Sequence, residues 1–201
     1  MKKNFIKISE PNHFIGAWNI NDGIMSEIID YFNSSHESHE VTKLASGLLD
    51  KNKRDSIQLS VTPKEIEKNN LTFFKNYLLE IKKCLNDYNK EWDLLSHSLK
   101  KSYISKISIE KFLISGHHID YHFARLNISS SHKVLTWITF LNDVKENEGS
   151  TEFKYLDCNI QPKKGLTIIF PSDWTHAHRQ NILKTQEKFI LHGNIQFSEI
   201  D

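Results

Sequence analysis

The stretch KFILHGNIQF, residues 188–197, shows best how the second half of this 201-residue chain folds. Its side chains alternate between two faces of an extended strand. One face carries Phe189, Leu191, Ile195 and Phe197, and the other carries Lys188, Ile190, His192, Asn194 and Gln196. The apolar face fits a core. The polar, cationic face fits either solvent or the wall of an anion-binding pocket, and this strand alone favours solvent.

Period-two alternation recurs before this strand, in ISKISIEKFLI (104–114), VLTWITF (134–140) and LTIIF (166–170). Turn residues such as Ser115-Gly116 and Pro171-Ser172 separate these runs. Short strands divided by turns are typical of a sandwich or barrel. We therefore expect a β-structure from about residue 103 onward.

The first half of the chain shows helical periodicity instead. GIMSEIIDYFNSS, residues 23–35, places its apolar side chains on one face of a helix. A second helical region is expected from residue 63 to about 92, with Thr62 and Glu65 forming a capping box at its start. These helices are expected to pack outside the β-structure.

Together these patterns predict a single α+β domain over residues 1–201, with helical support in 1–100 and a β core in 101–201. The formal net charge of +1 gives no field that would recruit nucleic acid or an anionic membrane. The run KNKR at 51–54 is interpreted as a solvated loop. The two cysteines are far apart in sequence, and the N-terminal stretch has no signal-like apolar run. No segment of the sequence is expected to span a membrane. These features favour a reduced, cytoplasmic protein. The oligomeric state stays open.

Histidine is unusually concentrated in the strand-rich half. Seven of the 11 histidines lie there: His117, His118, His122, His132, His176, His178 and His192. Neutral imidazole is the commonest transition-metal ligand in proteins. Two histidines from different strands and one acid form the facial triad of non-haem Fe(II) enzymes. The crowding therefore points to a metal site.

Five segments, in this order, carry a resemblance to a known family: SGHHIDYHFA (115–124), WITFLNDV (137–144), EGSTEFKY (148–155), QPKKGLTIIFPSDWTHAHRQN (161–181) and EKFILHGNI (187–195). Their order and spacing resemble the Fe(II)/2-oxoglutarate-dependent oxygenases of the prolyl 4-hydroxylase-like branch, especially short bacterial and phage members. The resemblance covers roughly the second half of the chain. It implies a double-stranded β-helix, the cupin-like jelly-roll barrel, and an oxidoreductase that uses Fe(II), 2-oxoglutarate and O2.

The resemblance also implies roles for individual residues. His122 and His178 correspond to the two iron-binding histidines, and Lys188 to the cation that holds the distal carboxylate of 2-oxoglutarate. His192 could lie beside the same carboxylate, which would give the polar face of the last strand a purpose. Phe140 occupies a position where the family often has a tyrosine, and phenylalanine cannot donate that hydrogen bond.

The stretch DYHFARL, residues 120–126, departs from the family at the third iron ligand, because Ala124 stands where a carboxylate is expected. One alternative is a shifted register, because His118-Ile119-Asp120 also spells His-x-Asp. Asp120 could then reach the metal, since residues 118, 120, 122 and 124 share a face of an extended strand. Another is an all-histidine site with His118 or His176 as third ligand. A third is a non-catalytic binding barrel.

Taken at face value, Ala124 vacates one iron position and removes one negative charge. A chloride or bromide fits such a vacancy, and this departure resembles that of the 2-oxoglutarate-dependent halogenases. The sequence-based prediction is a radical C–H halogenase of a small molecule, such as an amino acid or nucleotide, and a peptide substrate stays open. The alternative is a hydroxylase with water or Asp120 at the sixth iron position. HESHE (36–40) and LDKNKRDS (49–56) could fold over the mouth of the barrel as a lid, or be ordinary polar loops.

Overall fold

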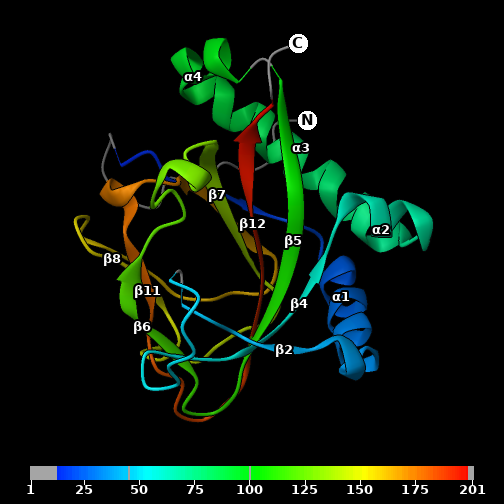
Figure 1. Cartoon of the computed structure of the whole chain (residues 1–201), viewed down its shortest axis with the longest axis vertical. Helices are drawn as coiled ribbons and strands as arrows, with labels where there is room; N and C mark the ends of the chain where they lie inside the picture. Colours follow the sequence, from blue (N-terminus) through cyan, green and yellow to red (C-terminus); the bar gives the residue numbers. More distant parts are fainter. Residues whose placement is uncertain (1–12, 45, 100, 199–201) are drawn as a thin grey trace.

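The computed structural model describes residues 13–44, 46–99 and 101–198, so the N-terminal stretch considered above lies outside the described residues. Two antiparallel β-sheets face one another, and helices lie outside one of them (Figure 1). The predicted α+β class is confirmed. In the described part of the chain, no helix combines the length and apolarity needed to cross a membrane.

The larger sheet has seven strands and the smaller has five. The larger runs in the order β1 (Gly16–Asn19), β10 (Leu166–Pro171), β7 (Lys133–Phe140), β12 (Lys188–Phe197), β5 (Ser102–Phe112), β4 (Ile57–Val61) and β2 (Glu40–Val41). The smaller runs in the order β3 (Arg54–Asp55), β6 (His117–His122), β11 (His178–Gln180), β8 (Thr151–Phe153) and β9 (Cys158–Ile160).

The helices are α1 (Asp22–Ser34), α2 (Pro63–Lys68), α3 (Thr72–Glu91) and α4 (Asp93–Ser98), with short 3-10 turns η1 (His36–Ser38), η2 (Ile128–Ser130) and η3 (Trp174–His176). The predicted capping box at Thr62 and Glu65 is present at the start of α2. On α3, the buried stripe of Phe74, Tyr77, Ile81, Cys84 and Tyr88 packs against the outer face of the larger sheet. The helices therefore pack outside the β-structure, as the sequence predicts.

Strand β12 separates two cores with its two faces. Phe189, Leu191 and Ile195 join the helix-covered core on the outer side. Ile190 joins a second core between the sheets, with Phe112, Phe140 and other apolar side chains. The alternation expected from the sequence therefore holds, and the polar face of β12 points between the two sheets.

The sequence analysis missed the strands of the first half. Strands β1 to β4 all lie before residue 62, where only helices were expected. Each is two to five residues long and joins a sheet beside a longer or more central strand. Such short segments carry too few alternations for a period-two pattern to stand out. The consequence for the site is that β3 brings residue 54 next to β6.

Candidate active site

The pairing of β6 with β11 places His122 and His178 directly opposite one another as Cα partners. Their ring centroids are 4.5 Å apart and their planes are inclined by 54°. Each ring is held through Nδ1, which lies 3.1 Å from the Asp120 carbonyl oxygen in His122 and 3.0 Å from the His176 carbonyl oxygen in His178. Among the described residues, no hydrogen bond reaches Nε2 of either ring, so these two nitrogens stay available to a ligand.

Burial keeps both imidazoles uncharged. It lowers the pKa of His178 to about 4, and it lowers the pKa of His122 well below its usual range. A neutral imidazole whose Nδ1–H is held by a carbonyl presents the Nε2 lone pair, which is the usual arrangement of a metal-binding histidine. The pair His122 and His178 therefore fits two positions on an iron ion.

Strand β6 does not stay extended between His118 and His122. Five residues of β6, 118–122, face only three residues of β11, 178–180, because Gln180 pairs with His118 and His178 pairs with His122. The extra residues bulge out, and the His118 ring stacks on the His122 ring with centroids 3.6 Å apart and planes 13° apart. An imidazole binds a metal in its own ring plane. Nearly parallel, stacked rings cannot both do so with one ion, so His118 does not complete the site in this arrangement.

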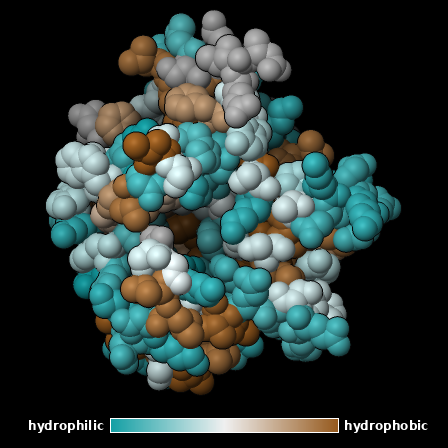
Figure 2. Space-filling view, in the orientation of Figure 1, coloured by the Kyte–Doolittle hydropathy of each residue, from teal (hydrophilic) through white to brown (hydrophobic). Residues whose placement is uncertain are grey.

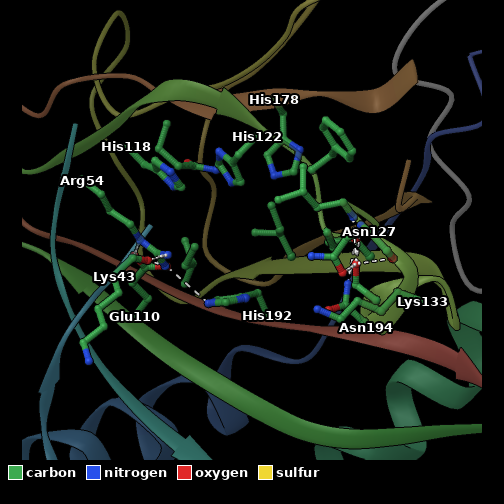
Figure 3. Close-up of a pocket in the computed structure, with 18 of the residues that line it drawn as sticks. Lys43, Arg54, Glu110, His118, His122, Asn127, Lys133, His178, His192 and Asn194 are labelled. Carbon is green, nitrogen blue, oxygen red and sulfur yellow. Dashed lines mark hydrogen bonds and ion pairs between the residues drawn. The ribbon is translucent and has the colours of Figure 1, made fainter. Parts of the chain in front are cut away.

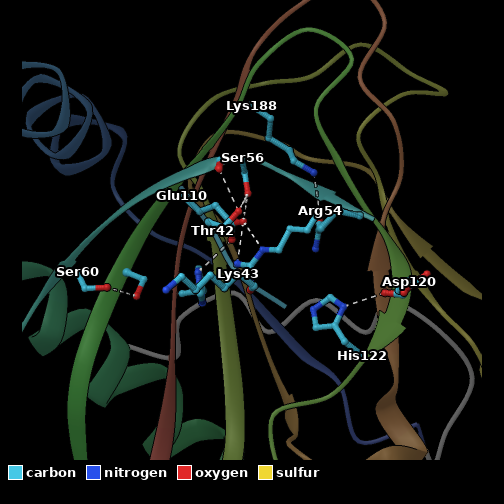
Figure 4. Close-up of polar contacts among 12 residues, drawn as sticks. Thr42, Lys43, Arg54, Ser56, Ser60, Glu110, Asp120, His122 and Lys188 are labelled. Atoms are coloured by element: carbon cyan, nitrogen blue, oxygen red, sulfur yellow. Dashed lines mark hydrogen bonds and ion pairs between the residues drawn. The ribbon is translucent and has the colours of Figure 1, made fainter. Parts of the chain in front are cut away.

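Asp120 lies on the bulge, and its carboxylate points away from the His122 imidazole (Figure 4). Its carboxylate forms an ion pair of 3.0 Å with Lys53 and its side chain is 45% exposed. The extended strand needed to bring Asp120 to the metal is therefore not formed. Within the described residues, no group of three or more His, Cys, Asp or Glu side chains is arranged to hold a metal.

His176 is engaged elsewhere. Its Nε2 lies 2.7 Å from the His13 carbonyl oxygen, and its Nδ1 lies 2.8 Å from the Thr175 hydroxyl. Neither nitrogen is left for a metal. The contribution of His176 to the site is its carbonyl oxygen, which holds the His178 ring.

Ala124 lines the same cavity as His122 and His178. Its backbone N–H donates to the Ser172 carbonyl oxygen over 3.1 Å, which fixes the segment after β6 to the end of β10. Its side chain is a methyl group, which the sequence analysis predicts to replace the carboxylate of the family pattern.

The cavity between the sheets has a volume of about 430 Å³. Figure 2 shows the hollow near the centre of one face of the molecule. His118, His122 and His178 lie along one wall, and His192 and Asn194 lie on the opposite wall (Figure 3). The polar face of β12 thus lines a pocket, which the strand taken alone did not favour.

Lys188 and Phe140 are buried behind this cavity and do not line it. The Lys188 ammonium donates to the Gly149 carbonyl oxygen over 2.6 Å and to Gln180 Oε1 over 2.7 Å. Burial lowers the pKa of Lys188 to about 7. Gln180 does line the cavity, and its Oε1 also accepts from the Thr151 hydroxyl. Gln180 therefore separates Lys188 from the cavity.

The sequence analysis also missed a buried ion pair that lines the cavity. Arg54 donates from Nε and Nη2 to Glu110 Oε1 over 3.0 and 2.8 Å, and Ser56 donates to the same oxygen over 2.5 Å. His192 Nε2 lies 3.3 Å from Glu110 Oε2. Arg54 is therefore not the solvated loop residue predicted for KNKR. One signal was available in the sequence. Glu110 lies two residues before Phe112 and so shares its inward face of the strand, and a buried carboxylate needs a cation as partner.

Residues 110–196 match the family model described as the 2OG-Fe(II) oxygenase superfamily. This match confirms the resemblance seen in the sequence. It also confirms the prediction of an enzyme of this class, and it allows either hydroxylation or halogenation. A comparison with curated proteins found no match.

Several solved structures share the fold. The viral collagen prolyl hydroxylase vCPH of Paramecium Bursaria Chlorella virus-1, in its 2OG complex, has a TM-score of 0.67 at 18% identity and covers 92% of this chain and 97% of its own. A Pseudomonas putida prolyl-4-hydroxylase has a TM-score of 0.68 at 12% identity, covering 93% and 94%. A Trichoplax adhaerens prolyl hydroxylase in complex with a hypoxia inducible factor peptide fragment has a TM-score of 0.69 at 12% identity, covering 92% and 84%.

These likenesses confirm the predicted jelly-roll core, and the structures named are prolyl hydroxylases, the branch that the sequence resembles. Fe(II), 2-oxoglutarate and O2 are the cofactors expected for the superfamily. None of the comparisons supports a halogenase or a chloride ion.

Proposed function

We propose that this chain is an Fe(II)/2-oxoglutarate-dependent hydroxylase acting on an aliphatic C–H bond. The observation that carries the proposal is the pair of buried, neutral imidazoles of His122 and His178, which are strand partners with Nδ1 of each ring held by a carbonyl. The superfamily match of residues 110–196 and the prolyl hydroxylases among the similar structures support it. Halogenation, the main prediction from the sequence, becomes the second candidate.

The residues have separable roles in this proposal. Nε2 of His122 and His178 would hold the iron, and bound Fe(II) with 2-oxoglutarate and O2 supplies the oxidising power for the C–H bond. Asp120 is paired with Lys53 and does not supply a third protein ligand. In the hydroxylase, water would therefore take the iron position that a carboxylate usually occupies. Phe140, Ile138 and Ile190, all buried, provide an apolar environment beside the site.

Lys188 is the proposed anchor for the distal carboxylate of 2-oxoglutarate. A buried ammonium with two neutral oxygen partners is short of negative charge, and a carboxylate would supply it. Because Gln180 stands between Lys188 and the cavity, the anchor requires Gln180 to give up its hydrogen bond to the ammonium. His192, which does line the cavity, is a further candidate contact for the cosubstrate.

Halogenation stays a candidate because of one observation. Ala124 is a small residue lining the cavity that contains the two imidazoles, and among the described residues no third His, Cys, Asp or Glu joins them in a metal-binding group. Chloride or bromide could therefore occupy the vacated position. The substrate in both candidates is proposed to be a small molecule. The named substrates of the similar proteins, collagen and a hypoxia inducible factor peptide, make a peptide the alternative.

Anaerobic absorption spectroscopy of the protein with Fe(II) and 2-oxoglutarate tests both candidates. We expect a charge-transfer band in the parent and none in His122→Ala. For the hydroxylase, the band stays unchanged when chloride and then bromide are added. A band that shifts with halide in the parent, but not in Ala124→Asp, would instead establish halide binding and favour halogenation. Absence of a band in the parent would overturn the iron and 2-oxoglutarate assignment.

A further inference from the structure

A second hollow continues from the cavity beyond the iron-binding histidines. Its volume is about 700 Å³. It shares five lining residues with the first cavity: Lys43, Arg54, Lys133, His192 and Asn194. The two spaces are therefore neighbours along β12, and one elongated molecule can extend from the imidazoles into the second hollow.

Cations gather on the lining of this second hollow. Lys106 comes from β5, Lys133 from β7 and Lys43 from the segment after β2. In the described part of the chain, none of these three ammonium groups has a carboxylate within ion-pair distance. Glu110, which lines the first cavity and not the second hollow, is already engaged by Arg54 and Ser56. Glu40 is the carboxylate on the lining itself, and it is exposed at the edge strand β2.

The ammonium group of Lys133 lies in an unfavourable electrostatic environment. Its side chain is half-buried, and burial lowers the pKa of Lys133, with a further decrease from the neighbouring charge of Lys106. Two like charges close together in a partly desolvated hollow repel one another, and a bound anion would relieve that repulsion. The polar side chains between them, Asn194 and Gln196 on β12 and Ser105 on β5, can add hydrogen bonds to such an anion.

We propose that the second hollow is a substrate subsite for a phosphate group, and that the substrate is a small molecule carrying a phosphate ester. The phosphate lies against Lys43, Lys106 and Lys133 while the reacting carbon lies beside His122 and His178. Lysine ammonium groups are point charges that suit a compact dianion. The assignment of a substrate rests on the proposed function, but the anion subsite itself does not.

Titration of the full chain with inorganic phosphate, followed by ¹H–¹⁵N NMR at low ionic strength, tests the subsite directly. We expect saturable shifts at the amides of Lys106, Lys133 and Asn194. Lys106→Gln/Lys133→Gln should weaken phosphate binding at least fivefold. Lys64→Gln/Lys82→Gln is the matched control, because both residues are exposed on helices outside the larger sheet. That control should bind phosphate as the parent does.

Four results would overturn the proposal. Shifts that grow linearly without saturation, or equal losses in both double variants, would mean non-specific attraction. A proline-rich peptide that shifts the same amides and is not displaced by phosphate would assign the hollow to a peptide. If Lys106→Gln/Lys133→Gln lost 2-oxoglutarate binding while Lys188→Met kept it, the hollow would be the cosubstrate site. Failure of the parent to bind 2-oxoglutarate would instead count against the proposed function and leave the phosphate titration valid.

Discussion

Among single residues, Lys188 has the most unusual environment. Its side chain is fully buried, the ammonium lies 4.7 Å from the centroid of the Phe112 ring, and its two hydrogen-bond acceptors are uncharged. Placing a charge in such a position costs folding free energy unless a partner compensates for it. We therefore expect Lys188 to lower the stability of the fold, which is typical of a residue retained for binding.

The variant Lys188→Met separates the cost of Lys188 to folding from its contribution to 2-oxoglutarate binding. Because the folded-state pKa is about 7 and the ordinary value is 10.5, the ammonium opposes folding below pH 7 and the penalty is relieved as pH rises. The parent should therefore gain about 2 kcal/mol of unfolding free energy relative to Lys188→Met between pH 7 and pH 9. The variant should also bind 2-oxoglutarate at least tenfold more weakly. Urea titrations at the two pH values and calorimetric titration with 2-oxoglutarate measure both effects. A stability difference that stays constant between the two pH values would show that Lys188 keeps its ordinary pKa in the folded protein, so that its charge is solvated or compensated there.

For single residues, the sequence predicts a role in the site best where the residue type serves few other functions in proteins. His122 and His178 could be paired from their spacing and family resemblance, and the structure places them opposite one another. Arg54 could not be placed, because its partner Glu110 lies 56 positions away and no local pattern links them. The same holds for Gln180, whose position between Lys188 and the cavity depends on the side chains of β8 and β12.

At the scale of elements, strand β6 decides what the site contains. The parity rule puts His118, Asp120 and His122 on one face, but the bulge against β11 replaces that arrangement with stacked imidazoles and an outward carboxylate. A bulge changes which side chains face the cavity without leaving an obvious mark in the residue pattern. Helix boundaries, in contrast, carry local chemical signals, and the capping box at Thr62 placed the start of α2 correctly.

Strand β12 offers a test of packing between elements. Gly193 pairs with Trp137 of β7, and a Cβ added at Gly193 would lie 2.4 Å from Cη2 of that indole. The indole is fully buried and its Nε1 donates to the Tyr77 hydroxyl over 3.0 Å, so it has little room to move. Gly193→Ala should therefore lower the free energy of unfolding by about 1–3 kcal/mol.

Urea unfolding followed by tryptophan fluorescence measures this loss. Trp137→Leu/Gly193→Ala is the matching variant, because the smaller side chain leaves room for the new methyl group. The double variant should be less destabilised than the sum of the two single variants. Simple additivity would mean that the alanine methyl does not meet the indole.

At the scale of the whole molecule, the site exists because two sheets are held at a fixed separation. Arg54 belongs to the five-stranded sheet and Glu110 to the seven-stranded sheet, so their ion pair joins the two walls of the cavity. Their side chains are 15% and 4% exposed, which makes this a buried pair. Breaking a buried pair by removing one charge costs far more than breaking an exposed one, because the remaining charge stays unpaired.

Glu110→Gln tests this connection between the sheets, and its pH dependence identifies the mechanism. Burial raises the pKa of the Glu110 carboxyl. The combined effect of Arg54, His192 and Ser56 is larger and in the opposite direction, so the pKa lies well below its usual range. A carboxyl with a depressed folded-state pKa contributes stability above its unfolded pKa of about 4.3 and loses it as pH falls toward the folded value. At pH 7 we expect Glu110→Gln to cost about 3 kcal/mol. Below pH 4 the difference from the parent should narrow.

The control for this variant is Glu187→Gln, which removes a carboxylate from a more exposed ion pair with Lys111. We expect it to cost less than about 1 kcal/mol at any pH. Urea midpoints of the three proteins at pH 7 and pH 3.5 provide the comparison. If Glu110→Gln costs no more than Glu187→Gln at pH 7, the ion pair does not join the sheets. If Glu110→Gln loses the same unfolding free energy at both pH values, the effect comes from packing. Only a titrating carboxyl makes the stability difference from the parent depend on pH.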